Sequence, residues 1–205
     1  MDILRELIDI VRGCDLQSFV KAYPNPFLLR YLTQEEIDQV TKEGAEMFDD
    51  QGTQQSRSPE VEMTDRFESY KPILRSEATT LARLSEPIQR FSCYPIIKTN
   101  RNIFPYGPTI GRTRNNDIIV PLPVVSKFHS WVQKNPDGTW YAYDARSRFG
   151  TFVDGIAVPP EGDQGRALRP GGTLRLGDVS LLFVEPASVY SWISLKLKTL
   201  HPGTI

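Results

Sequence analysis

Two helices are predicted near the start of the chain from the spacing of its apolar residues. One face of DILRELIDIV collects the large apolar side chains while the opposite face is charged; the apolar set is Ile3, Leu4, Leu7, Ile8 and Val11. Gly13 ends this pattern. A shorter helix is expected in DLQSFVKA, where Asp15 stands at the N-cap position.

A third helical pattern opens after the Pro-rich turn YPNPF. Thr33 and Glu36 have the spacing of a capping box, in which each side chain bonds the backbone of the other residue. The apolar residues that follow fall on one side, namely Ile37, Val40 and Phe48. We therefore predict that residues 1–48 form a helical N-terminal region. Three helices could make a small bundle, but so short a segment is marginal as an independent core, which favours docking onto the rest of the chain or onto a partner.

Residues 49–90 carry no clear pattern. The stretch DDQGTQQSRSPE, residues 49–60, lacks periodicity and large apolar residues and is typical of a flexible linker. Further on, ATTLARL fits either a short helix or a first strand, and the sequence does not decide between them. We expect 49–90 to be a linker or a weakly defined segment.

From residue 91 the pattern changes to that of strands. Short runs of β-branched and aromatic residues, such as YPIIKT, HSWVQK and WYAYDA, alternate with Gly, Pro, Asn and Asp. Many short strands separated by turns are typical of a β-sandwich or barrel, and we predict one over residues 91–188. Helical spacing returns in ASVYSWISLKL, so residues 189–205 are expected to form a C-terminal helix and tail that covers one end of the sandwich.

Charge is distributed unevenly between the two parts of the chain. Residues 1–90 hold 11 Lys and Arg against 17 Asp and Glu, whereas residues 91–205 hold 13 against 8. The positive second part favours an anionic ligand, although chance segregation of surface charge would produce the same counts. The overall charge of −1 does not indicate nucleic acid as a partner.

Other features of the composition narrow the classes of function. The two cysteines, Cys14 and Cys93, have no spacing that suits a metal, so we expect no metal, no cofactor and a reduced, cytoplasmic protein. Charged residues interrupt the N-terminal apolar run, which does not resemble a signal peptide. No apolar run approaches the roughly 20 residues that span a bilayer, and no membrane partner is expected.

Three loop segments of the β domain carry the polar residues of most interest: IGRTRNND, VVSKFHSWV and DARSRFGTFVDG. Loops separated by an even number of strands leave an antiparallel sandwich at the same end, so these segments can converge. Their convergence would gather a set of donors without a carboxylate: Arg112, Ser126, Lys127 and Arg148. Such a set suits a doubly charged phosphate better than it suits a metal or acid–base catalysis.

The same segments resemble a forkhead-associated (FHA) domain over residues 92–186. The resemblance rests on ordered fragments: Gly111-Arg112, NDI, Ser126-x-x-His129, DxxSxxGTFVDG, and Leu174 to Gly177 followed by VSLLFV. It implies a mainly β fold, an eleven-stranded antiparallel β-sandwich, extended here by N-terminal helices and a short C-terminal helix. It also implies that loops at one end bind phosphothreonine in an extended peptide or protein, without catalysis, beside a serine/threonine kinase in signal transduction.

The resemblance implies a role for each matching residue. Arg112 binds the phosphate, Ser126 donates its hydroxyl to it, and Lys127 adds a phosphate or backbone contact. Arg148 faces the peptide or the phosphate. The remaining matches are structural: His129 ties the binding loop down by hydrogen bonds, and the turns use Gly111, Gly150, Asp154 and Gly155.

Phe149 is the position where the chain departs from the family pattern, which has Asn-Gly in place of Phe149-Gly150. In the family, the resemblance implies, that asparagine bonds the backbone of the peptide, and phenylalanine has neither donor nor acceptor. We expect Phe149 either to turn inward and close the loop or to stay exposed as an apolar contact for a partner. Phosphopeptide binding is then weakened or retuned. The alternative function is an FHA-fold assembly adaptor whose phosphopeptide binding is weakened or lost.

Ser126 and His129 also suggest a nucleophile with its base. At positions i and i+3 across a loop–strand junction, however, the imidazole is not aimed at the hydroxyl, and no orienting acid is identified. We therefore predict that the protein is not an enzyme.

Overall fold

The computed structural model describes residues 3–38, 83–160 and 164–200. The chain divides into two units, one formed by Met1–Tyr31 with Arg75–Ile205 and the other by Leu32–Leu74. All the strands found in the described ranges belong to the first unit. Of the second unit, the structure describes only residues 32–38.

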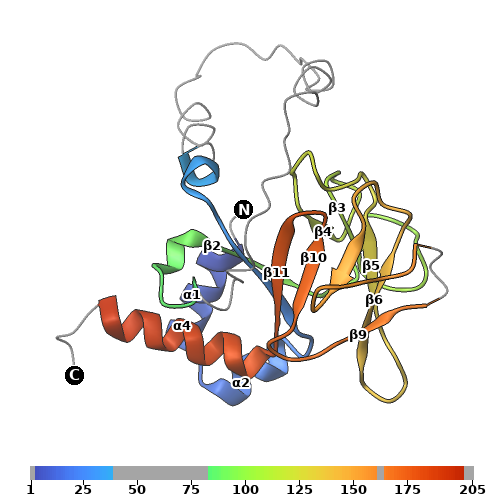
Figure 1. The fold of residues 1–205 in the computed structure, drawn as a ribbon. Coiled ribbons are helices and arrows are strands. Elements are labelled where there is room, and N and C mark those ends of the chain that lie inside the picture. The colour runs from blue at the N-terminus through green and yellow to red at the C-terminus, as the bar shows by residue number, and fades with distance from the viewer. Residues whose placement is uncertain (1–2, 39–82, 161–163, 201–205) are drawn as a thin grey trace, which may run out of the picture. The chain divides into compact units, whose positions relative to one another are not determined.

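Eleven strands in the described ranges form two sheets (Figure 1). The six-stranded sheet has the order β2 (Phe91–Pro95), β1 (Phe27–Tyr31), β11 (Val179–Val184), β10 (Thr173–Leu176), β7 (Thr151–Val153), β8 (Ile156–Ala157). The five-stranded sheet has the order β4 (Ile118–Ile119), β3 (Thr109–Gly111), β5 (Ser130–Lys134), β6 (Trp140–Asp144), β9 (Arg166–Leu168). The predicted mainly β fold with eleven strands is confirmed.

The prediction of a wholly antiparallel sandwich is wrong at one pair of strands. β3 and β4 pair in parallel, with Ile110 opposite Ile118 and Gly111 opposite Ile119. This pairing arises because residues 112–117 carry the chain back along β3 before β4 begins. The loop that contains Arg112 is therefore packed beside its own strand.

β1 comes from a part of the chain that the sequence analysis assigned to a helical region. It lies between β2 and β11, and Leu29 pairs with both Cys93 and Leu182. Its run FLLRY shows no alternation because both faces are buried. Leu28 packs in the core between the sheets, whereas Phe27 and Leu29 pack on the opposite face. A short, continuous apolar run of this kind cannot be assigned to a strand by periodicity.

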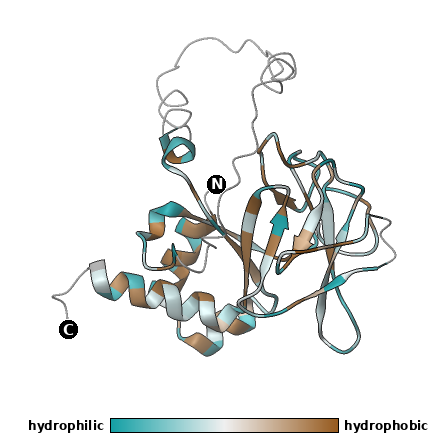
Figure 2. Cartoon of the chain, in the orientation of Figure 1, coloured by the Kyte–Doolittle hydropathy of each residue, from teal (hydrophilic) through white to brown (hydrophobic). Residues whose placement is uncertain are grey.

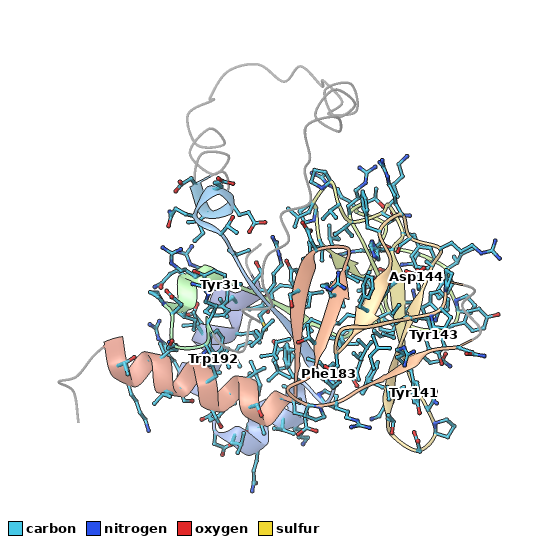
Figure 3. The ribbon with its side chains drawn as sticks, viewed as in Figure 1. Tyr31, Tyr141, Tyr143, Asp144, Phe183 and Trp192 are labelled. Carbon is cyan, nitrogen blue, oxygen red and sulfur yellow. The ribbon has the colours of Figure 1, made fainter. Side chains whose placement is uncertain are left out.

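The core between the sheets is built from every second residue of its strands. Val132, Ala142, Leu174 and Leu181 are fully buried there. The residues that alternate with them in the five-stranded sheet face outward, among them Tyr141 and Tyr143 (Figure 3). The ring of Tyr143 stacks on Trp131 of the neighbouring strand, with 5.2 Å between centroids. This alternation explains the strand-like pattern seen after residue 91.

A second core lies on the outer face of the six-stranded sheet. Three helices form it with β1, β2 and β11: α1 (Ile3–Gly13), α2 (Leu16–Ala22) and α4 (Pro186–Leu200), whose mixed polar and apolar faces are visible in Figure 2. The ring of Phe91 meets the edge of Trp192 at 5.0 Å between centroids. The expected docking is confirmed for the first two N-terminal helices. The C-terminal helix was predicted to cover one end of the sandwich, but it covers this outer face instead. A short 3-10 turn, η3 (Ile88–Arg90), leads into β2.

Two predicted helix starts are present. The carboxylate of Asp15 accepts a bond from the Ser18 N–H at 2.8 Å. At the next start, the Thr33 N–H donates to Glu36 Oε2 at 2.8 Å and the Glu36 N–H to Thr33 Oγ1 at 3.4 Å, which is a capping box. The continuation of that predicted helix, with most of the predicted linker, lies outside the described residues. No helix within the described ranges is long and apolar enough to cross a membrane.

Candidate functional site

Three loops meet at Ser126. The Arg112 N–H donates to the carbonyl of Ser126 at 3.0 Å, and the Arg148 N–H donates to its hydroxyl oxygen, also at 3.0 Å. These two bonds join the β3–β4, β4–β5 and β6–β7 loops. The predicted convergence of the three loops is therefore present in the structure. An even strand count does not explain it, because only β4 separates the first two loops and β4 pairs with β3 in parallel.

His129 fixes the backbone around this meeting point. Its side chain is fully buried; Nδ1 accepts from the Ser126 N–H at 3.0 Å, and Nε2 lies 3.1 Å from the carbonyl of Gly150. Because Nδ1 is an acceptor, the ring proton sits on Nε2 and is donated to Gly150, an assignment made from the bonding pattern. Burial lowers the pKa of His129 below its ordinary value, so the neutral ring is the stable form.

These bonds determine what the Ser126 hydroxyl can do. Its oxygen already accepts from the Arg148 N–H, so its own proton remains available for an acceptor outside the protein. The imidazole of His129 bonds the backbone N–H of Ser126 and not its hydroxyl. Both ring nitrogens are occupied by the backbone, and the ring cannot take a proton from Ser126. This arrangement suits binding and does not suit nucleophilic catalysis.

The β3–β4 loop depends on a close approach at Gly111. A Cβ at this residue would collide with the carbonyl oxygen of Lys127 and lie 2.7 Å from Nδ2 of Asn116. The same carbonyl accepts from Asn116 Nδ2 at 2.7 Å and from Thr113 Oγ1 at 2.8 Å. Asn116 bonds the Thr113 carbonyl within its own turn and also holds the neighbouring loop. Lys127 is thereby fixed through its backbone while its ammonium is exposed.

Asp117 holds a further loop against the start of β4, a role that sequence reasoning missed. Its carboxylate accepts from the backbone and hydroxyl of Thr99 at 2.7 and 2.5 Å, and from the Thr109 N–H at 2.8 Å. Lys98 Nζ lies 3.1 Å from the same carboxylate, and the Thr109 hydroxyl and Asn102 Nδ2 also donate to it, at 3.0 and 3.2 Å. Burial alone would raise the pKa of Asp117, but these bonds outweigh it and hold the pKa well below the usual range. The carboxylate is thus satisfied internally and adds no free negative charge to the site.

The β6–β7 loop is shaped by Asp144, at the end of β6 (Figure 3). Its buried carboxylate accepts from the Ser147 N–H and hydroxyl at 3.0 and 2.6 Å and from the Thr151 hydroxyl at 2.6 Å. Arg146, inside this turn, has a φ of 56°, and Gly150 has a φ of 76°. The carbonyl of Gly150 also accepts from the Gly177 N–H at 2.9 Å, which ties the loop to the β10–β11 turn.

Phe149 takes the exposed of its two expected positions. Its side chain is 37% exposed, and the guanidinium carbon of Arg148 lies 5.0 Å from the centre of its ring. Such a cation–π contact at an exposed site contributes about 0.5–1 kcal/mol. Phe149 and Arg148 therefore form one outward-facing, partly apolar and partly cationic surface beside Ser126.

Asp154 and Gly155 form the β7–β8 turn, as their sequence predicts. Both have positive φ, 50° and 78°, and Asp154 Oδ1 accepts from the Thr173 N–H at 2.8 Å. Asp154 belongs to the frame of the six-stranded sheet, since Thr173 begins β10.

Comparison with known proteins agrees with this geometry. Residues 109–177 match the family model described as the FHA domain. This segment is an FHA domain. The match contains each predicted site residue from Gly111 to Gly155, whereas β1, β2 and β11 lie outside it.

Relatives of this FHA domain include parts of much longer proteins. An ABC transporter ATP-binding/permease protein of Mycobacterium tuberculosis is 33% identical over 81 residues, which are 40% of this chain and 9% of that protein. Among solved structures, the FHA-2 domain of a Mycobacterium tuberculosis ABC transporter is 30% identical, covering 44% of this chain and 82% of that chain with a TM-score of 0.34. An Arabidopsis thaliana FHA domain is 28% identical, covering 40% and 70% with a TM-score of 0.35.

The end of this FHA domain where the three loops meet presents donors and cations. FHA domains are non-catalytic modules that bind phosphothreonine peptides in signalling. Of the predicted residues, Lys127, Arg148 and Phe149 are exposed and Arg112 and Ser126 are half-buried. Sequence reasoning missed two further exposed cations in the same loops, Arg114 and Arg146; their signal was only their place within the quoted loop segments.

Proposed function

We propose that this chain binds phosphothreonine in a peptide or protein of a cytosolic serine/threonine-kinase pathway and catalyses no reaction. The observation that carries the proposal is the bonding of Ser126. Its hydroxyl oxygen accepts from the Arg148 N–H, which leaves the hydroxyl proton to be donated outward between two arginine-bearing loops.

Each donor then has a distinct part. The guanidinium of Arg112 pairs with the phosphate dianion, since charge-assisted bonds of this kind are the strongest that a protein side chain makes. Ser126 donates its hydroxyl to an ionised phosphate oxygen, and Lys127 adds an exposed ammonium. Arg148 and Phe149 contact the residues that flank the phosphothreonine. His129 and Gly111 act indirectly, by holding the backbone that positions Ser126 and Lys127.

Titration with matched peptides tests this function. Fluorescence anisotropy with libraries of threonine and phosphothreonine peptides should show binding only of the phosphorylated members. Because a bond to a charged group contributes about 1.5–3 kcal/mol, Arg112→Ala should weaken this binding at least about ten-fold. Lys198→Ala, a matched removal of an exposed cation on α4, should have no effect.

The proposal fails if phosphorylated and unphosphorylated peptides bind equally and Arg112→Ala changes nothing. Ser126→Ala provides a second test with the same peptides, and its thermal midpoint shows whether any loss of affinity reflects unfolding.

The exposure of Phe149 favours a second candidate function, an FHA-fold assembly adaptor. An aromatic ring 37% exposed beside the site has no amide with which to bond a peptide backbone, but it can pack against an apolar residue of a partner. The phosphopeptides would then bind weakly or not at all. Capture of a defined partner that persists in an Arg112→Ala/Ser126→Ala double variant and disappears in Phe149→Ser would support the adaptor.

A further inference from the structure

The loops at the binding end carry more positive charge than one phosphate neutralises. Five cations stand in the three loops that meet at Ser126: Arg112, Arg114, Lys127, Arg146 and Arg148. The side chains of Arg114, Lys127 and Arg146 are exposed, and no hydrogen bond or ion pair is found for them within the described residues. A phosphate monoester carries about two negative charges at neutral pH.

The carboxylates of the same end are not placed to compensate these cations. Asp117 and Asp144 are 8% and 1% exposed, and both are fully engaged by bonds within the protein. Asp178, in the β10–β11 turn, is half-buried and also has an interaction within the structure. An excess of exposed positive charge therefore faces any bound peptide.

Arg146 is the member of this set with an unusual backbone. Its φ of 56° lies in the left-handed region, where a side chain costs energy and glycine does not. Neighbouring residues hold the turn around Arg146 closed, because the carboxylate of Asp144 accepts from both the N–H and the hydroxyl of Ser147. An arginine here weakens the fold slightly and points a guanidinium outward, two residues before the Arg148 N–H that bonds Ser126.

We propose that Arg146 is a specificity-determining residue, which favours phosphopeptides that carry further negative charge beside the phosphothreonine. This inference rests on the proposed phosphopeptide binding. The additional charge can come from Asp and Glu side chains or from a second phosphate, because both present negatively charged oxygens that accept hydrogen bonds from a guanidinium. Arg114 and Lys127 add to the same positive field. Arg146 is the cation chosen for the test, because its replacement by glycine should lower peptide affinity without lowering the stability of the fold.

The test compares one phosphothreonine peptide in four forms, with neutral flanks, with glutamates before the phosphothreonine, with glutamates after it, and with a second phosphothreonine. The wild type should bind at least one of the charged forms several-fold more tightly than the neutral form, and the difference should shrink in about 0.5 M salt. Arg146→Gly should weaken the preferred charged form about two- to five-fold, the size expected of an exposed ion pair. Its affinity for the neutral form should be unchanged, and its thermal midpoint should be equal or higher because the strain is relieved.

Arg146→Lys is the matched control, since it retains the charge and the backbone strain and should retain the preference. Equal affinities of the wild type for all four forms would overturn the inference and leave phosphopeptide binding intact. An equal loss for neutral and charged forms in Arg146→Gly would overturn it too, because Arg146 would then contact the common phosphate. If the wild type binds no phosphorylated form, the proposed function itself is refuted, and the inference with it.

Discussion

β1 should decide whether the sandwich folds. We compare a chain of residues 61–205, which retains the whole FHA match but lacks β1, with a chain in which residues 39–82 are replaced by about ten Gly and Ser residues. Tyr31 at the end of β1 pairs with Phe91 at the start of β2, and both chains lack part of the segment that joins these two residues. Only the first also loses the strand between β2 and β11, together with α1 and α2, which pack on the outer face of the same sheet.

The magnitude follows from burial and loop length. Phe27 and Leu28 are 0% and Leu29 is 1% exposed, and burying each such side chain contributes about 1.5–3 kcal/mol. The three together contribute about 5–9 kcal/mol, comparable with the whole stability of a small domain. Shortening the connection of about 60 residues to about 25 changes the loop-closure entropy by less than about 1 kcal/mol.

Urea unfolding followed by far-ultraviolet circular dichroism and tryptophan fluorescence measures both effects. The shortened chain should unfold cooperatively, with a free energy of unfolding within about 1 kcal/mol of the full chain. The 61–205 chain should show no cooperative transition. Leu28→Ala in the full chain is a milder variant and should lose about 2–5 kcal/mol. If residues 61–205 unfold with the same midpoint and slope as the full chain, the assignment of β1 to the sandwich core is refuted.

Three further predictions concern the loops. Phe149→Asn should tighten binding of a phosphothreonine peptide about five- to hundred-fold if the amide restores one or two backbone bonds; equal affinities by isothermal titration calorimetry would contradict this. Because burial holds the pKa of His129 below its ordinary value of 6.5, the unfolded chain takes up a proton that the folded chain resists, so stability should fall as the pH drops below about 6.5. Urea midpoints that stay level between pH 7.5 and 5.5 would contradict it, and His129→Gln should remove the dependence. Gly111→Ala should cost about 1–3 kcal/mol by thermal unfolding, since its Cβ would meet the Lys127 carbonyl, whereas Gly13→Ala, with open space around its Cβ, should not destabilise the protein.

The candidate site was predictable from sequence because its signals are local. Gly111 is needed because the backbone of Lys127 approaches it closely. His129 is needed because its ring bonds the backbone of two loops, at Ser126 and Gly150. The meeting of the loops was expected from an even count of strands, but the reason was wrong, because only β4 lies between the β3–β4 and β4–β5 loops and it pairs with β3 in parallel.

What could not be predicted depends on contacts that are distant in sequence. The role of Asp117 was missed because two of its partners, Thr99 and Thr109, are separated from it by 18 and 8 positions. β1 was missed because a strand buried on both faces has no alternation, and because its partners stand far along the chain. Arg146 is a separate case, because the bond between Asp144 and Ser147 that closes its turn is local, while arginine itself has no preference for a left-handed φ.

The pairing of β1 with β11 also constrains the order in which the protein can fold. Leu29 pairs with Leu182, about 150 residues later, so this contact has one of the largest sequence separations that the chain allows. During synthesis β1 leaves the ribosome early but has neither neighbour until β2 and then β11 follow. Strand contacts of such long range slow folding, because the chain must close a large loop before burial stabilises it. The three apolar residues of β1 therefore lack their neighbour on one side until β11 has been synthesised, and we expect folding in the cell to depend on chaperones that hold such a segment until β11 arrives.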